Sequence, residues 1–404
     1  MSRVVLAGMP AWGHVNPSLP IVRELTRCGV EVTYYTGPEF REPVERAGAE
    51  FRAYPPGSIG VRDIAEATRT GSTLRVVTRG LDATGVLLPF LVGELERDRP
   101  SAIAFDSNAL WGRMAAASLG LPMISLMTTL MVGGKDFSCL TARELGRFLG
   151  PTIRDLPATL AAKRRVVRRF GKDLYPPYPT LPMRGDVTIF PIPRWLQTDN
   201  PRVDETCHYV GPTFDEGGDG GFDAELAAFL DAPRPLVFVS LGTLHAGSDA
   251  FFRTCFEALD GLSARLLIAT GGTDPAGLGR IPADTLVRPS VPQRAVLRRA
   301  AAFVTHGGMN SALEGLAAGV PLVVVPQQAE QLIIGLKLAE RGAGTVLRHH
   351  LSGRPVPGAE LRAAVAQALT DPSRRAAAEK LGASLGDGGG AVAAVKAIQA
   401  RLGG

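Results

Sequence analysis

The sequence has few cysteines, and they lie far apart. Its 404 residues include four, Cys28, Cys139, Cys207 and Cys255, and none forms a Cys-x-x-Cys pair. This spacing excludes a disulfide-stapled fold and a cysteine zinc site, and it is typical of reduced cysteines that pack inside a cytoplasmic protein. The chain also lacks a DxD motif and a tight cluster of histidine and carboxylate residues, so we expect no metal site.

Long apolar runs are absent as well. No uninterrupted run approaches the roughly 18 residues that a membrane helix needs. The apolar start at residues 4–8 is followed too soon by Pro10 and Gly13 to be a signal peptide. We therefore expect a cytoplasmic location. The net charge of +5 is small for this length, so it favours anionic small ligands and gives no reason to expect nucleic-acid binding.

One segment is strongly basic. Five of the seven residues at 163–169 are lysine or arginine. The favoured interpretation is a solvated side of a helix, and membrane association is not expected. Contact with a membrane surface or with an anionic acceptor is the alternative, for which this segment is the only support.

Short apolar runs alternate with amphipathic stretches in two series. In the first series we expect strands at 4–8, 31–36, 50–54, 102–106 and 123–127, with helices at 20–28 and 110–119. In the second we expect strands at 236–240, 265–269, 285–288, 302–305 and 322–325, with helices at 250–261, 294–301, 311–318 and 328–341. This alternation predicts an α/β fold with two doubly wound parallel sheets.

A segment rich in glycine and acidic residues, 215–221, separates the two series and is typical of a linker. We expect an N-terminal domain at 1–205, a linker at 206–221, a C-terminal domain at 222–385 and a helical tail at 386–404. Neither half is a sequence duplication of the other.

A turn built from small polar residues follows the expected strand at 302–305. It contains His306, Gly307, Gly308, Asn310 and Ser311, and a helix begins inside it. Glycines allow close approach of the backbone, and a helix start presents unpaired N–H groups to an anion. The turn thus predicts a phosphate cradle without a P-loop lysine or a GxGxxG motif. The alternative is an ordinary connection with a capping Asn or Ser.

Two residues at strand ends of the first series are candidates for acid–base chemistry. His14 follows the first strand, and Asp106 ends the strand at 102–106. An imidazole can accept a proton near neutral pH, and a carboxylate beside it would fix its tautomer. Taken singly, a histidine at a strand end is more often structural, and for Asp106 the less favoured alternative is a cap of the next helix.

The spacing of these motifs resembles the UDP-glycosyltransferase superfamily, in particular bacterial macrolide and natural-product glycosyltransferases. The resemblance is carried by Val291-Pro292-Gln293, by residues 306–314, by Gly319-Val320-Pro321, Pro326 and Glu330-Gln331, and by Gly13-His14-Val15-Asn16-Pro17. It implies the GT-B fold, in which two Rossmann-like domains face each other across a cleft, with the last helix crossing back to the first domain.

The resemblance also implies roles for particular residues. His14 and Asp106 match the family's catalytic dyad, and Gln293 and Glu314 match residues that bind the nucleotide ribose. Glu330 and Gln331 match residues that bind the sugar hydroxyls. The remaining donor-binding candidates surround the diphosphate and the base: Ser240, Thr243, Val291, His306, Gly308, Asn310 and Ser311.

Ser290 departs from the family pattern. Many relatives carry an aromatic residue directly before Val-Pro-Gln, where the ring stacks on the base. Serine cannot stack, so base recognition here would depend on backbone contacts around Val291 or on another side chain. The sequence therefore leaves both uridine and thymidine open as the nucleoside of the donor.

The resemblance implies an inverting, metal-independent glycosyltransferase without a tightly bound cofactor, acting as a monomer or homodimer. It would move a hexose, first of all glucose from UDP-glucose, onto a hydroxyl of a small hydrophobic natural product such as a macrolide, polyketide or phenolic. The alternatives are an antibiotic-tailoring enzyme that uses a TDP-deoxysugar, a UDP-sugar epimerase, and a non-catalytic helper protein of the same fold.

Overall fold

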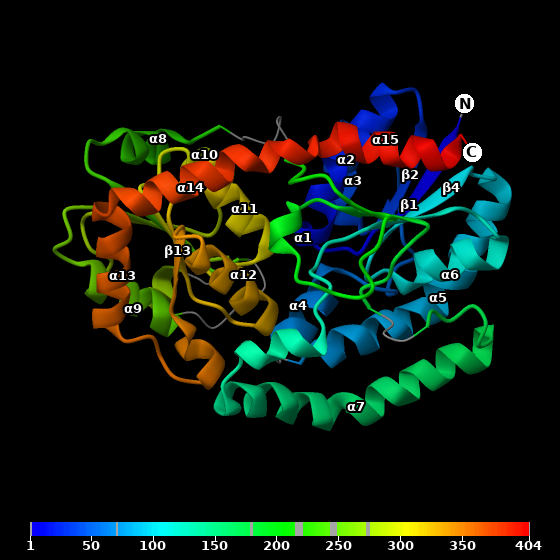
Figure 1. Cartoon of the computed structure of the whole chain (residues 1–404), viewed down its shortest axis with the longest axis horizontal. Coiled ribbons are helices and arrows are strands. Elements are labelled where there is room, and N and C mark those ends of the chain that lie inside the picture. Colours follow the sequence, from blue (N-terminus) through cyan, green and yellow to red (C-terminus); the bar gives the residue numbers. More distant parts are fainter. Residues whose placement is uncertain are drawn as a thin grey trace. The chain divides into compact units, whose positions relative to one another are not determined.

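The computed structural model describes residues 2–69, 72–177, 181–214, 221–242, 249–271 and 275–403. The chain divides into two compact units. The first contains Met1–Gly133, Phe148–Asp215 and Gly386–Gly404, and the second contains Gly134–Arg147 and Glu216–Leu385. Each unit is a parallel sheet covered by helices (Figure 1).

The described residues of the first unit form a seven-stranded parallel sheet in the order β3-β2-β1-β4-β5-β6-β7. Its strands are β1 (Arg3–Ala7), β2 (Glu31–Thr36), β3 (Glu50–Ala53), β4 (Ala102–Asp106), β5 (Met123–Leu126), β6 (Val187–Phe190) and β7 (Cys207–Tyr209). The helices that accompany it are α1 (Trp12–Val15), α2 (Leu19–Arg27), α3 (Arg41–Arg46), α4 (Val61–Arg69), α5 (Thr73–Asp98), α6 (Leu110–Leu119), α7 (Ala142–Phe170) and α15 (Gly390–Leu402).

The central strand β1 sends its side chains into two separate cores. Val4 and Leu6 pack with buried residues of α2 and α15, whereas Val5 and Ala7 pack with those of α5 and α6. Because successive side chains of a strand point to opposite faces, helices cover both faces of this sheet.

The described residues of the second unit form a six-stranded parallel sheet in the order β10-β9-β8-β11-β12-β13. Its strands are β8 (Leu236–Ser240), β9 (Arg265–Ala269), β10 (Thr285–Arg288), β11 (Ala302–Thr305), β12 (Leu322–Val324) and β13 (Gly344–Val346). Its main helices are α8 (Ala224–Asp231), α9 (Asp249–Leu259), α10 (Gln293–Leu297), α11 (Met309–Ala317), α12 (Ala329–Glu340), α13 (Gly358–Thr370) and α14 (Pro372–Ser384).

The expected fold class, two doubly wound parallel-sheet units, is confirmed. The strands expected at 31–36, 102–106, 236–240, 265–269, 285–288 and 302–305 have those bounds in the structure. Three strands, β6, β7 and β13, were not expected. They are three or four residues long and lie toward one edge of each sheet, where a short pairing suffices.

The final helix, α15, belongs to the first unit. It packs against α2, and its Ala394, Val395 and Ile398 enter the core that contains Val4 and Leu6. At its start the Gly390 N–H donates a hydrogen bond to the Val210 carbonyl oxygen at 2.7 Å. The chain thus begins and ends in the same unit.

Residues 134–147 belong to the second unit although they are flanked by chain of the first. Glu144, in the first turns of α7, is buried, and its carboxylate accepts from Arg348 Nε at 2.8 Å. Burial opposes ionisation of this carboxyl, but hydrogen bonds from Arg348 and Thr141 lower the pKa of Glu144 to about 2. A hydrogen-bonded ion pair with Arg348 therefore holds residues 134–147 in the second unit.

Among the described helices, α5 is long and apolar enough to cross a membrane by length and composition alone. Its Leu81, Leu87, Leu88 and Leu91 are buried in the core that contains Val5 and Ala7. The helix packs along α6 and also contacts α4. In this structure α5 therefore serves as a core helix of the first unit.

Candidate active site

The first candidate site lies at the carboxyl ends of β1 and β4. These strands are neighbours, with Ala7 opposite Phe105, and they mark the point where the strand order changes direction. In open α/β sheets ligands bind at such a point. His14, in the short helix after β1, and Asp106, the last residue of β4, are both placed there.

The two side chains are in contact. His14 Nδ1 lies 2.8 Å from Asp106 Oδ2, with 21% of the histidine side chain and 5% of the aspartate side chain exposed. The second carboxylate oxygen, Oδ1, accepts a hydrogen bond from the Asn108 N–H at 2.8 Å. Asp106 is thus held by the backbone on one side and by the imidazole on the other. It does not cap α6, whose N-cap residue is Ala109.

A third residue completes this site. Thr128 follows β5, and its Oγ1 lies 2.9 Å from the same His14 Nδ1. The Thr128 hydroxyl is in turn 3.3 Å from Ser107 Oγ. Asp106 and Thr128 therefore orient one nitrogen of the ring, which fixes the direction in which the other nitrogen, Nε2, points.

The second candidate site lies at the matching point of the other sheet. β8 and β11 are neighbours there, and Ser240 at the end of β8 is opposite Thr305 at the end of β11. His306 therefore follows β11 at the carboxyl edge, beside Ser240. Ser240 is buried, and its Oγ accepts from the Gly242 N–H at 3.5 Å.

Two glycines make room for the His306 ring. A Cβ atom at Gly242 would lie 2.9 Å from His306 Cε1, and a Cβ atom at Gly308 would collide with Nε2 of the same ring. Gly308 is the N-cap of α11 and makes no side-chain cap, with Asn310 and Ser311 in the first turn. Capping by Asn310 or Ser311, the alternative reading of this turn, is not what the structure shows. The N–H groups of the first turn of α11 therefore lie beside His306, and this arrangement is suited to binding an anion.

Gln293, Ser311 and Glu314 form a polar cluster next to this turn. Gln293 is the first residue of α10, and its Nε2 donates to Glu314 Oε2 at 2.6 Å and to Ser311 Oγ at 3.2 Å. All three side chains are half-buried. The half-buried Val291 lies two residues before Gln293. Residues from two separate motifs are thereby brought together.

Gln331 has a structural task in addition to any contact with a ligand. It is buried and takes part in a capping box at the start of α12. Its Oε1 accepts from the Gln327 N–H at 2.7 Å and from the Gln328 N–H at 3.2 Å. Glu330 lies in the same first turn and is half-buried. Gln331 therefore fixes the start of α12, which carries both Glu330 and Gln331.

Known proteins resemble this chain over almost its whole length. Residues 254–386 match the family model of the erythromycin biosynthesis protein CIII-like C-terminal domain. The chain is 30% identical over 403 residues to the NDP-glycosyltransferase YjiC of Bacillus licheniformis, an alignment that covers 99% of this chain and 97% of that protein. The chain is a glycosyltransferase. It belongs to the UDP-glycosyltransferase superfamily, in its bacterial natural-product branch.

Other relatives of this glycosyltransferase are named for individual natural products. It is 30% identical over 407 residues to the oleandomycin glycosyltransferase of Streptomyces antibioticus, covering 99% of this chain and 91% of that protein. The crystal structure of the glycosyltransferase of kitacinnamycin has a TM-score of 0.79 to it, at 28% identity and 99% coverage of both chains. The two-unit architecture of the glycosyltransferase is the GT-B fold that the resemblance implied.

The structure places twelve of the thirteen expected site residues, and the thirteenth, Thr243, lies outside the described residues. Sequence reasoning missed Thr128, because nothing in its neighbourhood marks a residue 114 positions from His14 as its partner. Among the described residues of the glycosyltransferase, no group of three or more His, Cys, Asp or Glu side chains could hold a metal ion.

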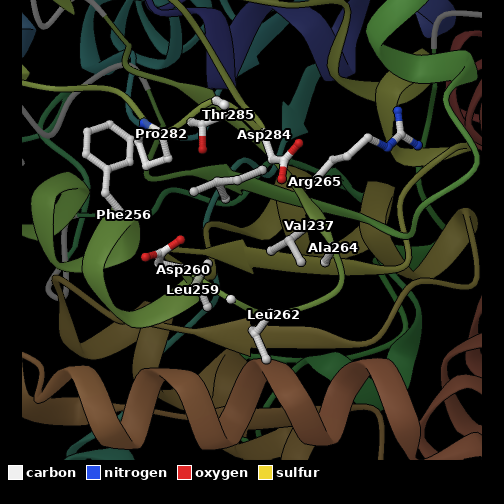
Figure 2. Close-up of a pocket in the computed structure, with 13 residues that line it drawn as sticks. Val237, Phe256, Leu259, Asp260, Leu262, Ala264, Arg265, Pro282, Asp284 and Thr285 are labelled. Atoms are coloured by element: carbon white, nitrogen blue, oxygen red, sulfur yellow. The ribbon is translucent and has the colours of Figure 1, made fainter.

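A separate pocket of about 150 Å³ lies in the second unit, away from the candidate donor residues of that unit (Figure 2). Arg265 and Thr285, the first residues of β9 and β10, help to line it, so it lies at the amino edge of the sheet. In Figure 2 the Arg265 guanidinium extends away from Val237 and Phe256. It donates to the Arg234 and Leu230 carbonyl oxygens. The pocket therefore stands opposite the edge that carries the candidate donor residues of the glycosyltransferase.

Proposed function

We propose that this glycosyltransferase is an inverting, metal-independent enzyme that glycosylates a hydroxyl of a small hydrophobic natural product. Glucose from UDP-glucose is the first donor that we propose. The observation that carries the proposal is the 2.8 Å contact between His14 Nδ1 and Asp106 Oδ2 at the switch point of the first sheet. We also propose that the first unit binds the acceptor and the second binds the donor.

In the proposed reaction the acceptor oxygen attacks the anomeric carbon of the sugar. The bond from that carbon to the diphosphate oxygen breaks in the same step, so the configuration inverts. The hydroxyl proton passes to His14 Nε2, and Asp106 accepts the Nδ1–H of the resulting imidazolium. This contact stabilises the positive charge on the ring. Thr128, on the same nitrogen, would keep the ring in this orientation.

The departing diphosphate gains negative charge, and the start of α11 suits it. His306 and the N–H groups from Gly308 to Ser311 would receive that charge, with Ser240, Thr243 and Asn310 as further polar contacts. Preorganised donors of this kind stabilise a leaving group without a cation. The glycine positions around His306 support this role, because any side chain there would displace the ring.

The remaining donor contacts follow from the polar cluster of the second unit. We propose that Gln293 and Glu314 bind the ribose hydroxyls, since a paired amide and carboxylate discriminate strongly for such groups. Glu330 and Gln331 would bind the sugar hydroxyls from the capped start of α12. Val291 would contact the base through its backbone.

A TDP-deoxysugar is the second donor candidate. Ser290 offers no ring to stack on uracil, and a relative from Streptomyces fradiae, 29% identical over 412 residues, is named as a demethyllactenocin mycarosyltransferase. Relatives named for oleandomycin and elloramycin support an antibiotic-type acceptor.

Mass spectrometry of the purified protein tests the proposal directly. The protein is incubated with UDP-glucose or TDP-glucose and a panel of macrolides, polyketides and phenols, and NMR gives the anomeric configuration of any product. A β-linked glucoside formed from the α-linked donor supports the proposal. A product that retains the configuration, or conversion of UDP-glucose to another UDP-hexose without any acceptor, would contradict it.

A further inference from the structure

The outer side of α7 exposes an unusual amount of apolar surface. Among the eight large apolar side chains that are exposed in the described part of the chain, four lie on this helix. They form the apolar stripe of α7: Leu149, Ile153, Leu156 and Leu160, with 40%, 66%, 42% and 44% of their surface exposed. Spacings of four, three and four residues place them on one side of the helix. Single exposed leucines are ordinary, whereas a row of them indicates a binding surface.

A different side of α7 attaches it to the first unit. Asp155, Thr159, Ala162 and Val166, which are also spaced by four, three and four residues, are buried. Thr159 Oγ1 lies 2.9 Å from Thr78 Oγ1 of α5. Figure 1 shows α7 running along the outer side of α5. The apolar stripe is about a third of a turn away from this attached side, so α5 does not cover it.

Cations continue the apolar stripe toward the end of the helix. Lys163 and Arg164 follow Leu160 by three and four residues, and Arg168 follows Arg164 by four, so these side chains lie on or beside the same side. Arg164 and Arg168 are exposed. One face of α7 thus combines a row of apolar side chains with a row of positive charges.

The charges of α7 argue against a second copy of the chain as the occupant of this face. The helix contains eight lysine and arginine residues and two carboxylates, Glu144 and Asp155, and it is described throughout. Both carboxylates are buried, and they pair with Arg348 and with Arg75 and Arg154. Two copies of α7 packed together would bring cations close without an available carboxylate, whereas an anionic surface would neutralise them.

We propose that this face of α7 binds the surface of a membrane that contains anionic phospholipid. The apolar stripe would enter the headgroup region, and Lys163, Arg164 and Arg168 would contact lipid phosphates. An amphipathic helix with leucines beside lysines and arginines binds the bilayer interface in this way, lying in its plane without spanning it. A transferase held there would meet hydrophobic acceptors where they concentrate, in the bilayer.

Vesicle sedimentation tests the apolar part of the face. The full-length protein is mixed at low salt with vesicles of equimolar phosphatidylcholine and phosphatidylglycerol, or of phosphatidylcholine alone. We expect binding only to the anionic vesicles, and a loss of about tenfold or more for Ile153→Ser with Leu156→Ser. Ile281→Ser with Val392→Ser, which replaces exposed apolar side chains in the loop before β10 and on α15, is the matched control and should bind like wild type.

A second pair of variants tests the charges. Arg164→Gln with Arg168→Gln should weaken binding about 30-fold, because each cation near an anionic surface contributes roughly fivefold. Arg41→Gln with Arg46→Gln removes the same charge from α3, where both arginines are exposed and paired with glutamates. This control should bind like wild type. Circular dichroism and melting temperatures would show that all variants are folded, as exposed substitutions normally are.

Three results would overturn the proposal. The first is absence of wild-type binding to anionic vesicles. The second is wild-type binding to phosphatidylcholine vesicles that equals its binding to anionic vesicles, or binding of the α7 variants that equals that of wild type. The third is a dimer, seen by light scattering, that dissociates in the Ile153→Ser, Leu156→Ser variant, because it would assign this face to a second copy. None of these measurements uses a donor or an acceptor. Their outcome therefore tests membrane binding independently of the proposed transferase activity.

Discussion

The hydroxyl oxygen of Thr128 lies 2.9 Å from His14 Nδ1, the nitrogen that also faces Asp106. This contact makes Thr128 a positioning residue for the proposed base. We expect Thr128→Val to lower kcat roughly 2- to 10-fold, which corresponds to the loss of one ordinary hydrogen bond. The KM for the nucleotide sugar should stay close to wild type, because Thr128 belongs to the first unit. Thr254→Val on α9 is a matched control, and an equal loss in both variants would assign Thr128 no special role.

Removal of the proposed base should have the largest effect. His14→Ala should lower the rate of O-glycosylation by about 100- to 10,000-fold, the usual contribution of general-base catalysis, while calorimetry shows nearly unchanged donor binding. Asp106→Asn should reduce the rate similarly or less, since it leaves the imidazole in place. A thiophenol acceptor, which loses its proton easily, should recover part of the His14→Ala activity. Equal losses with an alcohol and with a thiophenol would indicate a positioning role.

The contribution of His306 is tested by His306→Ala. Loss of one well-placed donor to a developing negative charge costs about 2.7–4 kcal/mol, so kcat should fall about 100- to 1,000-fold and donor binding should weaken. His208→Ala in β7 provides a matched histidine control in the first unit. An unchanged rate together with an unchanged donor affinity would show that the turn after β11 is purely structural.

The proposed metal independence leads to a simple measurement. Because the start of α11 and His306 are proposed to receive the charge of the diphosphate, activity should persist after dialysis against EDTA. Addition of Mg2+ or Mn2+ should change the rate little. An enzyme that is inactive in EDTA and fully restored by either cation would require a different account of the leaving group.

The contact between the buried Glu144 and the half-buried Arg348 predicts a pH dependence of stability. The folded pKa of Glu144 is lowered to about 2, below the value of about 4.3 for an unfolded chain. Its contribution is therefore complete above pH ~4.3 and decreases as the pH falls from there toward 2. Glu144→Gln should lower stability by roughly 1.5–3 kcal/mol at neutral pH.

Thermal melting between neutral and acidic pH measures this effect. The difference in melting temperature between wild type and Glu144→Gln should shrink as the pH falls below about 4.3. Glu45→Gln, which removes an exposed partner of Arg41, should cost much less at every pH. A constant difference across the pH range would refute the assignment.

The sequence predicts the centre of each sheet, and the edges formed by β3 and β10, better than the edges formed by β7 and β13. β4 and β8 are five residues long and buried on both faces, so each appears as four apolar residues in a row that a polar residue, Asp106 or Ser240, ends. β7 and β13 have three residues each, Cys-His-Tyr and Gly-Thr-Val, and no apolar pattern can develop over that length. Their pairing is set by the neighbouring strand, which a single sequence does not display.

The same contrast holds for the candidate site. His14, Asp106 and the turn after β11 are marked by fixed local patterns at strand ends, and parallel strands bring such ends to one edge. The contact of Thr128 with His14 depends on the side-by-side order of β1, β4 and β5. The capping role of Gln331 depends on where α12 begins, which a pattern locates only to within a few residues.

The position of α15 has a consequence for the synthesis of the protein. The helix covers the sheet that contains β1, yet it is synthesised after all the strands of the second unit. The first unit therefore keeps an uncovered apolar face, between α2 and β1, while the whole second unit is being made. The second unit, whose strands all lie within residues 236–346, can fold before the first is complete. The core of the first unit is completed only when α15 has been made, so a nascent chain stalled before Gly386 should be a substrate for chaperones.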